Sequence, residues 1–353
     1  MNVNGSSRYA PFRCHRAIGI HLGRLIALLL LLAPALSAAG ESQTGSPFMR
    51  GVALGLFSQD RSYNYEREID QIKALNANYI SLVVNMVQDN VKSEGVYRPE
   101  SAPSDETIAR VAAVAHSRGL SVFLFPIIYV VDVRPGKWRG TIDPPSWDRW
   151  FESYNRILFD YADLAQKHGI ELLLVGCEQI SSEKRNDLWL KLIAGIRQRY
   201  HGKLIYSSNW DRLSKESFLD KLDYLGSNAY FELARSNHPN KQELLYNWKR
   251  IQQRYDEWRA KFHKPLVFTE IGYPSADGCS QNPWDYTTNA PVDLEEQALC
   301  YEAFFQSWKG IEYLHGAFVY AWWGDGGPLD RSYTPRGKPA EAVLKEWFLH
   351  RFP

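Results

Sequence analysis

Short, nearly continuous apolar runs alternate with longer amphipathic stretches along most of this chain. Continuous apolar runs are typical of strands buried on both faces, whereas apolar positions three and four residues apart indicate helices with one buried face. The predicted strands are 50–57, 78–87, 120–130, 170–178, 203–210, 222–230, 265–273 and 315–323. The predicted helices are 63–76, 105–119, 146–168, 185–200, 214–221, 241–261, 293–309 and 338–349. This strict alternation predicts a parallel sheet covered by helices on its outer face.

Eight strand–helix units within residues 50–353 match an α/β (β/α)8 TIM barrel better than an open doubly wound sheet. The connections from a helix to the next strand are very short. The connections from a strand to the next helix are long at 88–104, 131–145, 274–292 and 324–337. Long loops therefore gather at the carboxyl ends of the strands, where barrel enzymes build their sites. We predict a single domain over residues 50–353.

The first forty residues have a different pattern. Basic residues precede the apolar stretch LIALLLLLAPALSAAG (25–40), in which small residues at 37–39 suit cleavage. We predict a signal peptide over 1–39, a short mature segment over 40–49, and a secreted or periplasmic protein. An uncleaved N-terminal anchor is the alternative. The apolar stretch is too short for a comfortable membrane span, so we expect no membrane segment in the mature form.

The charge balance and the cysteines restrict the partners and the redox chemistry. Removing residues 1–39 changes the net charge from +1 to about −3, because this segment holds four arginines and no acid. A near-neutral balance gives no electrostatic reason to expect a nucleic acid or an acidic membrane as partner. Cys177, Cys279 and Cys300 remain in the mature chain, an odd number for a compartment that permits disulfides. A Cys279–Cys300 disulfide stays open at this point, and Cys177 would then be a buried free thiol.

Two predicted strands carry a glutamate at their carboxyl ends. Glu178 ends the fourth strand and Glu270 lies in the apolar run LVFTEI of the seventh. Burying a carboxylate is costly unless it is paired, and a barrel places both groups on one rim. Two carboxyl groups across a cleft are what glycoside hydrolysis needs, one to donate a proton and one to attack the anomeric carbon. The alternative is that each acid merely pairs with a basic residue at the barrel mouth.

Several segments together resemble glycoside hydrolase family 113, of the β-mannanase-like TIM-barrel glycosidases of clan A. The resemblance covers roughly residues 50–350 and rests on VGCEQ, SSNWD, LDYLGSNAYFEL, FTEIGYPSADG and WRGTIDPPSWDRWFESY in this order. It implies Glu178 as general acid/base, Glu270 as nucleophile and retention of anomeric configuration. Characterised relatives are chiefly β-1,4-mannanases, so the implied substrate is a β-linked polysaccharide or oligosaccharide, with mannan first and glucan or another hemicellulose next. Cys177 departs from the pattern, because the clan usually has Asn before the acid/base glutamate.

Other residues near the predicted strand ends are candidates for binding the sugar. By the same resemblance, Tyr230 would hold Glu270 ionised and oriented. An aromatic plane suits the C–H face of a pyranose, and only one of the adjacent Trp322 and Trp323 can point into the cleft. The remaining substrate-binding candidates are Asn209, Trp210 and, on a long loop, Trp138. Packing in the core or at the rim is the alternative for each.

The sequence lacks the motifs of several other classes of enzyme. It holds no His-Glu-x-x-His motif, no closely spaced Cys/His set, no acidic calcium loop and no Gly-x-Ser-x-Gly elbow, so we expect neither metal nor cofactor, and no esterase. We therefore predict an exported monomeric retaining glycoside hydrolase. A carbohydrate-binding barrel without turnover and a transglycosylase are the alternatives.

Overall fold

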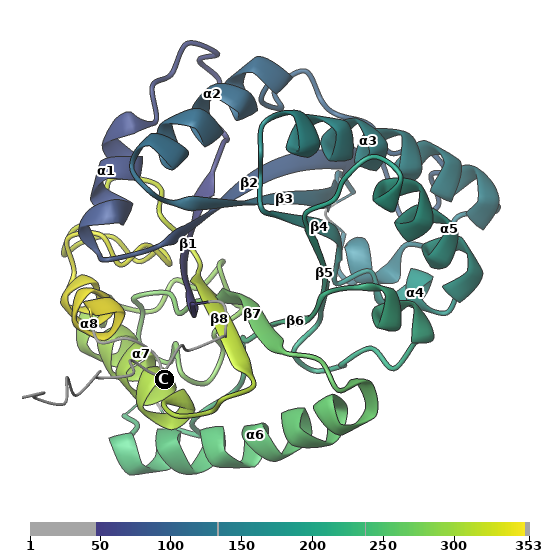
Figure 1. The fold of residues 1–353 in the computed structure, drawn as a ribbon. Helices are drawn as coiled ribbons and strands as arrows, with labels where there is room; N and C mark the ends of the chain where they lie inside the picture. The colour runs from purple at the N-terminus through teal and green to yellow at the C-terminus, as the bar shows by residue number, and fades with distance from the viewer. Residues whose placement is uncertain (1–46, 133, 237, 350–353) are drawn as a thin grey trace, which may run out of the picture. The chain divides into compact units, whose positions relative to one another are not determined.

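The computed structural model describes residues 47–132, 134–236 and 238–349. The predicted signal peptide (1–39) and most of the segment 40–49 lie outside these residues. The strands are β1 (Met49–Gly55), β2 (Tyr79–Gln88), β3 (Ser121–Val130), β4 (Leu172–Cys177), β5 (Lys203–Ser208), β6 (Tyr224–Asn228), β7 (Leu266–Ile271) and β8 (Leu314–Val319). They form one closed parallel barrel in sequence order, so the predicted (β/α)8 barrel is confirmed (Figure 1).

The helices surround the barrel in the order expected from the sequence (Figure 1). The α-helices are α1 (Glu66–Ala74), α2 (Asp105–Ser117), α3 (Trp147–Lys167), α4 (Ile180–Glu183), α5 (Asn186–Arg197), α6 (Lys241–Phe262), α7 (Leu294–Trp308) and α8 (Pro339–Leu349). The 3-10 helices are η1 (Arg139–Thr141) and η2 (Ser217–Lys221). The short helix expected at 214–221 is thus only the 3-10 turn η2, and α4 and η1 were not expected. No helix of the described residues is long and apolar enough to cross a membrane.

Barrel closure follows from the register of the first and last strands. Val52 of β1 pairs with Ile80 of β2 on one side and with Val319 of β8 on the other. Alternate side chains along each strand point to opposite faces, so one set fills the barrel and the other meets the helices. Phe123, Phe125 and their neighbours form the inner cluster, while the larger cluster packs between strands and helices.

Local signals explain where several helices begin and why the helix-to-strand turns are tight. The side chains of Ser104 and Asn240 accept hydrogen bonds from backbone N–H groups of the first turns of α2 and α6, as N-cap residues do. Gly119 and Gly169 follow α2 and α3 with φ of 68° and 65°, a left-handed conformation that reverses the chain tightly. These helix-to-strand turns are short, so the long loops lie at the opposite end.

Candidate active site

Glu178 and Glu270 come together at the carboxyl ends of β4 and β7. Glu178 directly follows β4, and its N–H donates to the carbonyl of Ser207 on β5 at 2.8 Å. Its φ of 53° lies in the left-handed region, which is rare for a residue with a Cβ and common at functional sites. Glu270 lies within β7, and the two residues are only 6% and 4% exposed. Burial raises the pKa of Glu270, and the charge of Glu178 raises it further, so the two carboxyl groups interact.

Arg139 pairs with Glu178 and interacts electrostatically with Glu270, although it comes from the β3–α3 loop. Its Nη2 donates to Oε2 of Glu178 and forms an ion pair with that carboxylate. Burial alone would lower the pKa of Arg139, but the nearby charges, with Glu178 first and Glu270 among them, raise it above its usual value. The guanidinium therefore neutralises part of the negative charge of the buried pair. It also lies 6.0 Å from the ring of Trp138, which is half-buried beside it.

Two donors hold the carboxylate of Glu270. Tyr230 Oη donates to Oε2 at 2.7 Å, and Cys177 Sγ donates to Oε1 at 3.7 Å. Burial raises the pKa of the Cys177 thiol well above its usual value, so the thiol keeps its proton and acts as the donor. Cys177 is a free, buried thiol, as expected from the sequence, and it contacts the glutamate of the other strand end. Each oxygen of Glu270 thus has a donor that fixes its orientation.

The ionisation of Glu270 is set by opposing effects. Burial, and after it the charge of Glu178, raise its pKa, and the net value is about 7. Arg139, Tyr230 and Cys177 oppose it by favouring the charged form, through charge or through hydrogen bonding. Near neutral pH this carboxyl group therefore lies close to the midpoint of its titration.

Aromatic side chains from three other strand ends surround the pair. Tyr320, just after β8, packs edge-on against Tyr230 at 6.3 Å and against Trp323 at 4.8 Å between ring centroids. Phe57, after β1, lies 5.9 Å from the ring of Trp323. Tyr129, on β3, hydrogen-bonds to Tyr320. These rings line the space beside Glu270 and can contact the apolar face of a sugar.

The structure separates the two adjacent tryptophans that follow β8. Trp323 packs with the inner cluster and is partly exposed on the cleft side. Trp322 is 1% exposed, and its Nε1 donates to the side chain of Gln71 on α1 at 3.1 Å. Successive side chains point to opposite faces, so Trp322 belongs to the layer between barrel and helices. Of the two candidates, Trp322 thus packs beneath α1, and Trp323 stays the predicted substrate-binding residue.

Asn209 and Trp210 lie at the rim just after β5. The side-chain oxygens of Asn209 and Asn228 both accept from the backbone N–H of Trp210, at 3.0 and 2.7 Å. Asn209 is only 6% exposed, so its carbonyl oxygen serves the local turn. The ring of Trp210 stacks on Trp284 of the β7–α7 loop, with centroids 5.1 Å apart and planes 19° apart. This stacked pair forms part of the rim.

Sequence reasoning missed three members of this cluster. Arg139 falls on a predicted loop, and Tyr129 and Tyr320 fall within the predicted strands 120–130 and 315–323. A buried cation facing two acids leaves no periodic signal when it comes from a loop. The aromatic residues at the ends of β3 and β8 could have been found by the rule that already singled out Glu178 and Glu270.

One acidic cluster and one cysteine pair lie apart from these residues. Oxygens of Asp277, Asp293 and Glu296 lie within 4.8 Å of one another. Both oxygens of Glu296 accept backbone hydrogen bonds from the β7–α7 loop, and Asp293 caps α7, so these two acids serve the fold. Cys279 and Cys300 are buried free thiols, so the disulfide left open by the sequence is absent from the described residues.

The chain is similar to known proteins of one family. The model of Glycoside Hydrolase Family 113 matches residues 52–332. A solved structure described as a complex of a GH113 β-1,4-mannanase is 26% identical with a TM-score of 0.78, over 87% of this chain and 100% of that chain. The GH113 β-mannanase AaManA from Alicyclobacillus acidocaldarius, in complex with ManMIm, is 30% identical with a TM-score of 0.77, over 86% of this chain and 98% of that chain.

More distant structures share only the fold. A β-glucuronidase from Ruminococcus gnavus is 13% identical with a TM-score of 0.58, over 86% of this chain and 49% of that chain. The comparison with curated proteins gives no match. The family match covers most of the chain and includes the ends of both β4 and β7. The chain is a glycoside hydrolase and belongs to glycoside hydrolase family 113.

Proposed function

We propose that this protein hydrolyses internal bonds of β-1,4-linked mannan or its oligosaccharides. The anomeric configuration is retained. The observation that carries the proposal is the pair of nearly buried carboxyl groups at the ends of β4 and β7, which have different partners around one arginine. Different surroundings are what allow two carboxyl groups to hold different protonation states at one pH. The substrate class is supported by the mannanases among the similar structures.

Glu270 suits the role of nucleophile. Its two oxygens accept from Tyr230 and Cys177, which fix the carboxylate and favour its charged form. Glu178 suits the role of general acid and base, because the mechanism requires a second carboxyl group across the cleft. We expect the two carboxyl groups to lie about 5 Å apart during catalysis, as in retaining enzymes.

The reaction then runs in two steps. An oxygen of ionised Glu270 forms a bond to the anomeric carbon, the bond to the leaving oxygen breaks, and protonated Glu178 gives its proton to that oxygen. In the second step Glu178 takes a proton from water, the water oxygen bonds to the anomeric carbon, and the bond to Glu270 breaks. Both glutamates return to their first state, and the configuration is retained after two inversions.

Arg139 connects the resting arrangement with the reactive one. In the structure it is paired with Glu178, while burial and the charge of Glu178 hold the pKa of Glu270 near 7. The reaction needs the opposite distribution, with the proton on Glu178 and the charge on Glu270. When a sugar ring displaces the guanidinium from Glu178 toward Glu270, the attraction of Arg139 favours the ionised nucleophile. The number of protons on the two glutamates stays the same, and a proton only moves from Glu270 to Glu178.

A panel of β-1,4-linked manno-, gluco- and xylo-oligosaccharides tests both substrate and linkage. We expect Glu270→Gln to lose turnover on manno-oligosaccharides while it still binds them in calorimetry. Glu183→Gln is the matched control, because Glu183 is also a buried glutamate but pairs with Tyr206. Equal activity of wild type and Glu270→Gln would contradict the assignment. Formation of longer oligosaccharides as the main products would favour transglycosylation over hydrolysis.

We also propose that the protein is exported and acts as a monomer. The support is the basic and apolar pattern of residues 1–39, which is that of a signal peptide. The measurement is N-terminal sequencing of the protein recovered from the periplasm or the medium, with light scattering for its mass. A chain that keeps residues 1–39 and stays in the cytoplasm would contradict export.

A further inference from the structure

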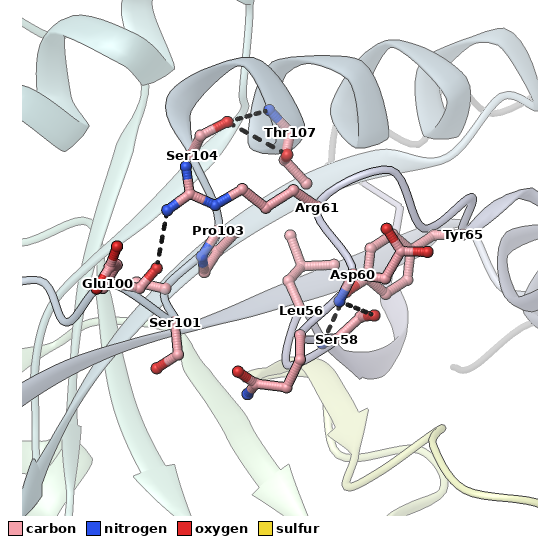
Figure 2. Close-up of a pocket in the computed structure, with 12 residues that line it drawn as sticks. Leu56, Ser58, Asp60, Arg61, Tyr65, Glu100, Ser101, Pro103, Ser104 and Thr107 are labelled. Atoms are coloured by element: carbon pink, nitrogen blue, oxygen red, sulfur yellow. Dashed lines mark hydrogen bonds between the residues drawn. The ribbon is translucent and has the colours of Figure 1, made fainter.

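A pocket of about 510 Å³ lies between the β1–α1 and β2–α2 loops, at the same end of the barrel as the two glutamates. Figure 2 shows its wall, in which Arg61 reaches from the first loop to the second. Its Nη2 donates to the carbonyl of Glu100 at 3.2 Å. This contact ties the two loops together, and the pocket is therefore a defined recess.

A second, smaller pocket leads from this recess toward the catalytic pair. It has a volume of about 210 Å³ and shares Gln59 and Ser101 with the larger pocket. Its other lining residues are Phe57, Asn85 and Tyr129. Phe57 contacts Trp323, and Tyr129 hydrogen-bonds to Tyr320, which packs against Tyr230. A continuous set of side chains thus runs from Glu270 to the recess.

The chemistry of the two pockets suits a neutral ligand with many hydroxyl groups. The charge of Arg61 is offset by Asp60 and Glu100 in the same wall, so no single sign of charge dominates. The side chains of Gln59 and Ser101 make no hydrogen bond within the described residues, and both are exposed. The side-chain oxygen of Asn85 is buried and has no partner in that part of the chain. These groups offer donors and acceptors to a ligand, and a buried oxygen without a partner favours binding of a donor.

We propose that the two pockets form a distal subsite that binds a sugar unit of the same β-linked chain that is cleaved between Glu178 and Glu270. The inference rests on the proposed glycosidase function. It adds that polar contacts from Gln59, Ser101 and Asn85 hold the chain away from the cleaved bond. Long oligosaccharides therefore gain affinity that short substrates lack, because only they reach both the catalytic pair and the recess.

The test compares mannohexaose with an aryl β-mannobioside as substrates for variants of the two shared residues. We expect Gln59→Leu and Ser101→Leu to lower the ratio of kcat/KM for the long substrate over the short one. The expected loss is about tenfold in the double variant, which corresponds to about 1.4 kcal/mol. Using a ratio makes the result independent of the fraction of protein that is folded.

Ser117→Leu is the matched control, because Ser117 is an exposed serine at the far end of α2 and lines neither pocket. Its ratio should equal that of wild type. A ratio that is unchanged or raised in both pocket variants, with an active wild type, overturns the subsite and leaves the proposed function standing. Wild type that cleaves neither substrate contradicts the proposed function itself. Calorimetry in the Glu270→Gln background gives a second readout, in which the pocket variants should weaken binding of mannohexaose by a similar factor.

Discussion

Tyr230 Oη lies 2.7 Å from Oε2 of Glu270, and this hydrogen bond joins the end of β6 to the carboxylate of β7. The tyrosine favours the charged form of a carboxyl group whose pKa burial raises to about 7. Tyr230→Phe should therefore raise the pKa of Glu270 further, and the acid limb of kcat/KM should move to higher pH. A hydrogen bond to a charged group is worth about 1.5–3 kcal/mol, so we expect activity at neutral pH to fall about tenfold or more. Tyr200→Phe is the control, because Tyr200 is also buried but donates to the backbone of Ile170.

Arg139 should affect the same acid limb through its charge. It lowers the pKa of Glu270, so Arg139→Met should move the acid limb of kcat/KM to higher pH. Loss of the cation also removes charge stabilisation from a nearly buried site, and we expect kcat to fall by about 10²-fold. Arg134→Met on the same loop is the control, since Arg134 is exposed and pairs only with Asp132 among the described residues. If the acid limb of kcat/KM in Arg139→Met lies at the same pH as in wild type, the proposal that Arg139 moves from Glu178 toward Glu270 is contradicted.

Glu178 should matter most for poor leaving groups. A general acid contributes about 10²–10⁴-fold when the leaving oxygen needs a proton, and little when it leaves readily as an anion. Glu178→Gln should therefore lose most of its activity on oligosaccharides and much less on a dinitrophenyl glycoside. The measurement is the dependence of kcat/KM on the pKa of the leaving group. An equal loss on both kinds of substrate would assign Glu178 another role.

Substitutions of the adjacent Trp322 and Trp323 should have opposite effects. One should lower stability and the other should lower turnover. Trp322 donates to Gln71 beneath α1, so Trp322→Phe should lower the free energy of unfolding by about 1 kcal/mol and leave kcat/KM of the folded protein near wild type. Trp323 lies beside Tyr320 and Phe57, so Trp323→Ala should lower kcat/KM by about tenfold, or about 1.4 kcal/mol. Thermal unfolding and steady-state kinetics on both variants check the pair. A loss of turnover in Trp322→Phe at full stability would contradict the assignment.

The cysteine thiols should not react with a thiol reagent in the native protein. Cys177, Cys279 and Cys300 are buried, and burial raises the pKa of Cys177 and Cys279 well above the usual value for a thiol. Only a thiolate reacts readily, so a chromogenic disulfide reagent should label none of them before unfolding. After unfolding without reductant, a chain without residues 1–39 should show three thiols. A count of one would reveal that Cys279 and Cys300 form a disulfide.

The fold could be predicted because its signals are repeated and local. Most strands are nearly continuous apolar runs, and the predicted ends of α2, α3, α5, α6, α7 and α8 agree with the structure to within a few residues. The elements that escaped prediction, α4 and η1, have only four and three residues, which is too short for a helical period.

The candidate site could be predicted only in part. A glutamate at the end of an apolar strand is visible in the sequence, so Glu178 and Glu270 were found. The side chain of Arg139 comes from a long loop, and no sequence pattern predicts where such a side chain lies. The period of two showed that only one of Trp322 and Trp323 faces the cleft, but both follow the last residue of β8, so the pattern could not decide which. Such choices are made by tertiary packing.

The stacked rings of Trp210 and Trp284 give the cleft an optical signal of its own. Two indoles only 5.1 Å apart and nearly parallel couple their electronic transitions, which produces a paired band in circular dichroism. One ring is fixed after β5 and the other belongs to the β7–α7 loop, so any movement of that loop changes the coupling. Binding of a polysaccharide at this rim can therefore be followed by circular dichroism of the unlabelled protein.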